Sequence, residues 1–309
     1  MTGGHFDVTA REQIRFIQDR LLAMARWAKE AGVDDRAAEF LIRPYRSLLD
    51  TMYQRELPLA RLADQSDLLL HVRGPAATGP TPRVSMVTRL LSGTRDQITR
   101  LAKQLHGVTS LRVPAALDLG FVGVAEGSLY LGFSAEEVDG ASATRDAVAT
   151  IATASEVVTA DQTLDDLTQR FEDPATRDIA LAAVRQMSPS GHAGITEVDI
   201  YGRNIQRRIA LTTQTRRHAR LLMAQPPRRR GTPASTTFTG TVREVDLDAS
   251  RFEIRNVDGH ADDIRCAHEL DEEDAKQLVD RRVRVTGRPE FGPKGNVRLL
   301  WVDELEMTG

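Results

Sequence analysis

Residues 203–230 read RNIQRRIALTTQTRRHARLLMAQPPRRR, and this stretch divides the chain into its parts. It contains nine arginines and no aspartate, glutamate or lysine. Residues 66–202 and 235–309 each carry a net charge of −6, whereas residues 1–65 are neutral. A basic block between acidic segments is typical of a nucleic-acid contact, of a strip that docks on the protein's own acidic surfaces, or of a solvated helix and linker.

Six arginines of this stretch are the first candidates for binding nucleic acid or an acidic partner. They are Arg216, Arg217, Arg220, Arg228, Arg229 and Arg230. The first three share one helical surface, because residues three and four apart are neighbours on a helix. The other three belong to a basic, proline-rich linker that we expect at 226–235. The chain has 37 arginines but four lysines, which indicates a GC-rich coding bias, so arginine counts alone carry little weight.

The composition is that of a soluble globular protein of two or three domains, with 41% apolar and 28% charged residues in 309. The first ten residues have no basic start and no apolar run, and no later stretch approaches ~18 uninterrupted apolar residues. We therefore expect neither secretion nor a membrane partner. The single cysteine, Cys266, excludes an internal disulfide and favours a reducing cytoplasm. We expect a prokaryotic protein.

The first two thirds of the chain predict an α+β fold. Helical spacing covers residues 9–31, a second helix begins at Asp35 and is interrupted by Pro44, and a third ends at Pro58. From Leu68 onward, short apolar strands are interleaved with groups of helices. We expect a helical region at 1–65 packed on a mixed domain at 66–225.

Residues 236–309 predict five short strands with one helix between the third and the fourth. This order, and most closely the segments RVRVTG (282–287) and 299–306, resembles OB-fold modules. The resemblance implies a small five-stranded β-barrel. An SH3-like barrel is the competing interpretation, and the intervening helix disfavours it.

Alternation along these strands separates a barrel core from an outer surface. The residues of core parity are Phe252, Ile254, Ile264, Cys266, Val283, Val285, Val297 and Leu299. The residues of outer parity include the binding candidates Arg255, Arg265, Arg284 and Arg298, as well as Arg243 and Arg282. Cross-strand pairing with Glu244, Glu253 and Asp263 is the alternative role for these arginines.

No motif for catalysis, metal ligation or cofactor binding stands out. Neither GxxxxGK[ST] nor GxGxxG occurs, and the seven histidines are scattered without HExxH or HxH. The loop 188–194 gathers Ser188, Ser190 and His192 but lacks the GxSxG elbow, so a simple connection explains it. We predict no catalytic residue, metal or cofactor, and a buried, inert Cys266.

Two classes of function are therefore left. The first is a non-catalytic binding or regulatory protein that acts through a protein partner or self-association, because two acidic modules that flank a basic strip suit electrostatic docking. The alternative is nucleic-acid binding through the arginine strip and the OB-like sheet face. Aromatic residues, which stack on bases, make up only 5% of the chain, and this favours the first class.

Overall fold

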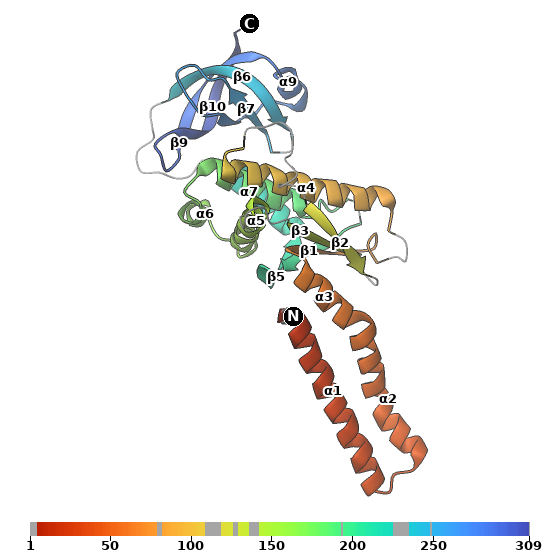
Figure 1. The fold of residues 1–309 in the computed structure, drawn as a ribbon. Coiled ribbons are helices and arrows are strands. Elements are labelled where there is room, and N and C mark those ends of the chain that lie inside the picture. The colour runs from red at the N-terminus through yellow and green to blue at the C-terminus, as the bar shows by residue number, and fades with distance from the viewer. Residues whose placement is uncertain are drawn as a thin grey trace.

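The computed structural model describes residues 5–78, 82–108, 119–125, 129–135, 142–192, 194–224, 235–247 and 249–308. The fold is α+β, as predicted from the sequence. Three parts follow one another along the molecule: a helical arm at one end, a sheet with its helices in the middle, and a small β-barrel at the other end (Figure 1). Among the described residues, no helix is both long enough and apolar enough to cross a bilayer.

Two antiparallel helices, α1 (His5–Glu30) and α2 (Asp35–Thr51), form most of the arm. In the turn between them, Gly32 adopts a left-handed backbone conformation with φ of +63°. The side chain of Asp34 then caps α2 by accepting hydrogen bonds from the first backbone N–H groups of that helix. We call residues 5–56 the arm.

The predicted interruption at Pro44 is wrong, because α2 continues through this residue. Proline removes one backbone hydrogen bond, but Tyr45 and Leu49 beyond it pack on the apolar face of α1, and this packing keeps the helix intact. The chain continues as the π-helix η1 (Met52–Glu56) and as α3 (Leu57–Gln65), which contacts the sheet.

The central sheet is antiparallel throughout and has the strand order β2-β3-β1-β4-β5. Its strands are β1 (Leu68–Arg73), β2 (Leu119–Ala125), β3 (Leu129–Ala135), β4 (Glu197–Gly202) and β5 (Ile205–Thr212). Its helices are α4 (Val84–His106), α5 (Ala143–Thr159), α6 (Leu164–Arg170), α7 (Pro174–Met187) and α8 (Thr213–Ala224). Leu68, Leu70 and Val72 point to the helices and form the main core with them, while Leu69 on the other face packs near α3.

The barrel closes with the strand order β10-β8-β7-β6-β9, in which β9 and β10 also pair. Its elements are β6 (Thr236–Asp246), β7 (Arg251–Arg255), β8 (Ile264–Ala267), α9 (Glu272–Gln277), β9 (Arg282–Phe291) and β10 (Val297–Met307). Helix α9 lies between the third and fourth strands, and β10 runs parallel to β8. This barrel is compatible with an OB-like module.

Most core positions of the barrel agree with strand alternation, but Leu299 does not. Phe252, Val283 and Val285 are fully buried in the barrel core. A bulge between Val297 and Leu299 shifts the register of β10, so Leu300 enters the core instead. Leu299 points to the other side of the strand and packs with Ala267 and Trp301.

Candidate functional site

Helix α7 and the barrel are joined by charged side chains that are almost completely buried. Asp178 accepts hydrogen bonds from Arg251 at 2.9 Å and from Arg265 at 2.6 Å, and each of the three residues is only 3% exposed. Burial alone raises the pKa of Asp178, but the positive charges and hydrogen bonds of Arg251 and Arg265 hold this pKa well below its ordinary value. Asp178 is therefore ionised at neutral pH and holds two barrel strands against the helix.

The neighbouring residue on α7 makes a second buried contact with the barrel. One guanidinium nitrogen of Arg177 donates to both carboxylate oxygens of Glu290, at 2.9 and 2.8 Å. The indole N–H of Trp301 donates to the same carboxylate at 2.7 Å. Because successive residues on a helix point about 100° apart, Arg177 and Asp178 reach different strands. Sequence reasoning missed both residues; their signal was an adjacent Arg-Asp pair within the alanine-rich first turns of the helix.

These contacts occupy the barrel surface on which OB modules bind oligonucleotides. That surface is the face of the second and third strands, which here are β7 and β8. Arg251 of β7 and Arg265 of β8 point from this face onto Asp178 of the same chain. A ligand can therefore reach this part of the sheet only if the barrel leaves α7.

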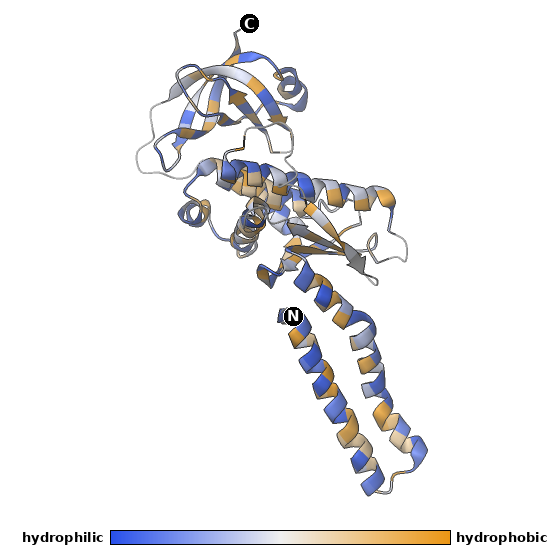
Figure 2. Ribbon diagram, in the orientation of Figure 1, coloured by the Kyte–Doolittle hydropathy of each residue, from blue (hydrophilic) through white to orange (hydrophobic). Residues whose placement is uncertain are grey.

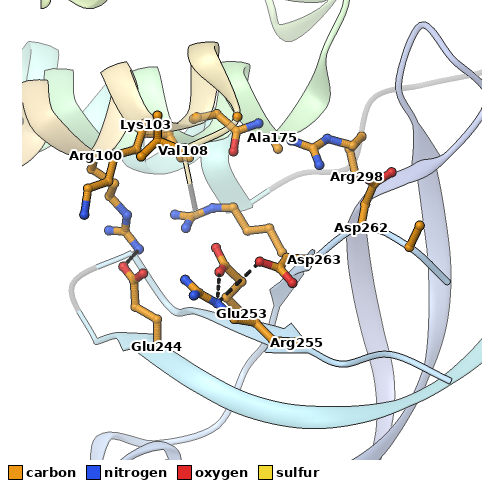
Figure 3. A pocket seen from close by; sticks show the side chains of 15 residues that line it. Arg100, Lys103, Val108, Ala175, Glu244, Glu253, Arg255, Asp262, Asp263 and Arg298 are labelled. Atoms are coloured by element: carbon orange, nitrogen blue, oxygen red, sulfur yellow. Dashed lines mark hydrogen bonds and ion pairs between the residues drawn. The ribbon is translucent and has the colours of Figure 1, made fainter. Parts of the chain in front are cut away.

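A cavity of about 330 Å³ lies where α4 and α7 meet the barrel. We call this boundary between the helices and the barrel the seam. Figure 3 shows both basic and acidic side chains around the cavity. The ion pairs are Arg100 with Glu244 at 2.5 Å, Arg255 with Glu253 at 2.9 Å and with Asp263 at 3.4 Å, and Arg298 with Asp173 at 3.2 Å. Burial is the main cause of a raised pKa at Asp263. The charges of the wall are largely balanced, which disfavours a polyanion in this cavity.

The structure brings three of the predicted barrel arginines to this one cavity. Arg255, Arg265 and Arg298 all line it. Arg284 lies elsewhere on the barrel, where it is exposed and pairs with Glu306 at 3.7 Å. The sequence placed all four on the outer surface of the barrel but did not show that α7 covers part of that surface.

The arginine strip of residues 203–230 is partly bound to the chain's own groups. Arg203 contacts Asp67 at 3.1 Å, and Arg208 contacts Asp199, whose carboxylate also lies 3.1 Å from a ring nitrogen of His71. Arg216 donates to backbone carbonyls at the end of α7. Arg217 and Arg220 are exposed on α8. Arg228, Arg229 and Arg230, with most of the predicted linker, lie outside the described residues.

The arm presents the largest group of exposed apolar side chains that we find among the described residues. Val8, Phe16, Leu22, Trp27, Phe40, Leu48 and Tyr53 are each between 42% and 70% exposed. Figure 2 shows hydrophobic positions spread along both helices of the arm, which extends away from the sheet. Phe16, Ile17, Leu48 and Met52 line a groove of about 430 Å³ between the two helices. Exposed apolar surface of this extent is typical of an interaction site.

No catalytic arrangement is visible at the positions that the sequence singled out. The Ser188 hydroxyl donates to the carbonyl of Val184 at 2.7 Å and is buried. Burial raises the pKa of the Cys266 thiol, which is fully buried and so is not nucleophilic. In the parts of the chain that the structure describes, no three His, Cys, Asp or Glu side chains are grouped to hold a metal ion.

No protein-family model, curated protein or solved structure matches this chain. Function is therefore inferred from the surfaces of the molecule itself. Of these, the seam is closed by buried pairs, whereas the arm exposes large apolar side chains among its charged residues.

Proposed function

We propose that the protein is a non-catalytic, cytoplasmic binding or regulatory protein, and that the arm is its contact surface. The observation that carries this proposal is the row of exposed apolar side chains on the arm, led by Phe40 at 70% and Phe16 at 61% exposed. Leaving them in water is unfavourable by roughly 1.5–3 kcal/mol for each large side chain relative to full burial. A partner that covers them gains part of this free energy, because these side chains are already partly buried.

The partner that fits best is the arm of a second copy. Residues 1–65 contain 10 basic and 10 acidic residues, so two arms meet without net repulsion. Two helical hairpins that pair through their apolar faces form a four-helix bundle, which is a common solution for such surfaces. In a two-fold dimer of this kind, the groove lined by Phe16 and Leu48 on one arm would meet the same groove on the other.

Measurement of mass in solution by sedimentation tests this proposal. We expect the wild-type chain to sediment as a dimer and the double variant Phe16→Asp/Leu48→Asp as a folded monomer, because two buried carboxylates at the interface are unfavourable. Leu221→Asp is the matched control, since Leu221 is also exposed but lies on α8. A monomeric wild-type chain at high concentration would rule out self-association.

A further inference from the structure

A second cavity lies on the seam, where α7 and α8 end against the barrel. Its volume is about 480 Å³, within the range of small-molecule sites. Four arginines line it, Arg185, Arg220, Arg251 and Arg288, against two acids, Glu269 and Asp303. An adjoining cavity of about 430 Å³ shares Arg185 and Arg220 with it. Asp271 and Glu272 line this adjoining cavity, so the excess of positive charge is confined to the first of the two cavities.

His268 lines both of these cavities and has a hydrogen-bond donor to spare. Its Nδ1 accepts from the backbone N–H of Leu270 at 3.2 Å, so the proton of the neutral ring is on Nε2. Nε2 is buried and has no partner among the described residues, while His268 as a whole is 7% exposed. A buried N–H without an acceptor is unfavourable.

The surrounding cations are arranged to hold an anion. Arg220 is exposed and has no ion-pair partner in the described part of the chain. Arg288 pairs with Asp303 at 3.5 Å, and both side chains are nearly half exposed, so this pair is weak and an anion can compete for the guanidinium group. Arg251 also lines the wall, but its charge is compensated by Asp178.

We propose that this cavity binds a small molecule through a phosphate group. The guanidinium groups of Arg220 and Arg288 donate to the phosphate oxygens, and the ring of His268 lines the cavity beside them. Guanidinium groups suit a phosphate because they offer paired donors in a plane. The ligand bridges the end of α8 and the barrel, so binding stabilises their closed arrangement. This site is independent of the arm and of self-association.

Inorganic phosphate is the probe, with potassium chloride at equal ionic strength as the reference. We expect phosphate to raise the unfolding temperature of the full chain above that in chloride, because it binds only the folded state. Proton-nitrogen NMR of the wild-type chain should show a shift of the His268 Nε2 resonance. Burial is the main cause that lowers the pKa of His268, followed by the charge of Arg251. This pKa should rise when phosphate binds. No shift at His268, or equal stabilisation by chloride, would overturn the proposal.

Two variants distinguish a specific phosphate site from nonspecific attraction of phosphate to positive charge. Arg220→Gln should weaken phosphate binding about tenfold or more, since a charged hydrogen bond is lost. Arg217→Gln is the matched control, because Arg217 is exposed on the same helix and donates a hydrogen bond to Gln214 at 3.3 Å. An equal loss in both variants would contradict the site. Adenosine monophosphate in a parallel titration distinguishes the sources: tighter binding than phosphate indicates an organic phosphate, and equal binding indicates the free anion.

Discussion

At the scale of single residues, Asp178 supports two buried guanidinium groups. Both guanidinium groups are only 3% exposed, and removal of the Asp178 charge leaves Arg265 with the more distant Asp246 at 3.9 Å. We expect Asp178→Asn to lower the free energy of unfolding by about 3–5 kcal/mol. Asp280→Asn is the matched control: Asp280 pairs with Arg243 in solvent, so its loss should cost less than about 1 kcal/mol. Urea unfolding measures the free energy of unfolding of both variants. Equal losses would show that the buried pair of Asp178 contributes no more stability than a pair in solvent.

The same carboxylate makes stability depend on pH. The pKa of Asp178 is lower in the folded chain than the value of about 3.9 in an unfolded chain. Its contribution is therefore complete above the unfolded pKa and is lost as pH falls through the acid range towards the folded pKa. We expect the unfolding free energy to fall more steeply between about pH 5 and pH 3 in the wild type than in Asp178→Asn. Parallel pH profiles for the two proteins would contradict this assignment.

At the scale of elements, alternation in β9 divides the barrel core from its surface. Val285 is fully buried, whereas Arg284 is exposed. Val285→Asp should unfold the barrel, because an unpaired charge in an apolar interior costs several kcal/mol. Arg284→Asp should change stability by less than about 1 kcal/mol. Circular dichroism during thermal unfolding tests the pair, and similar effects at both positions would reverse the assignment of the two faces.

Exposed arginines on helix α8 allow a test of nucleic-acid binding, the alternative function. With the OB-like face covered, Arg217 and Arg220 are the strip residues left exposed on this helix. We expect a fluorescent single-stranded oligonucleotide to bind weakly, and the double variant Arg217→Gln/Arg220→Gln to leave that binding unchanged. Titration at two salt concentrations is the measurement. A steep loss of affinity with salt that the variant flattens would favour nucleic-acid binding instead.

Helices and strands could be predicted from the sequence where the signal lies within the element itself. Pro174 at the start of α7 and the apolar spacing after it predict the same bounds that the structure has, and the strand at 264–267 likewise agrees. The bulge before Leu299 was not predictable, because it depends on pairing with two strands at once. The seam was missed for the same reason: Arg177 and Glu290 are 113 residues apart, and their contact exists only after both parts have folded.

At the scale of the whole molecule, the predicted boundary at residues 226–236 is open to test by limited proteolysis. We expect cleavage there to give a stable C-terminal fragment of roughly 70 residues, of the size of a small domain. The buried pairs at the seam should keep this fragment bound to the remainder under native conditions. Cleavage confined to the interior of the sheet region or of the barrel would contradict this division.

The molecule has two kinds of surface. The seam is covered within one chain, and the arm is exposed at the end far from the barrel (Figure 1). A molecule of this shape can expose the arm to a partner without disturbing the seam. We therefore expect two copies of the chain to associate through the arm.

Distance measurement between spin labels tests this claim most directly. Cys266 is fully buried, so a cysteine introduced at exposed Arg26 of the arm is the accessible thiol for labelling. A cysteine at exposed Lys294, in the barrel turn, is the matched control. We predict a defined dipolar distance between two arm labels, lost in the Phe16→Asp/Leu48→Asp background. The absence of any dipolar coupling between arm labels, or a defined short distance only between barrel labels, would contradict it.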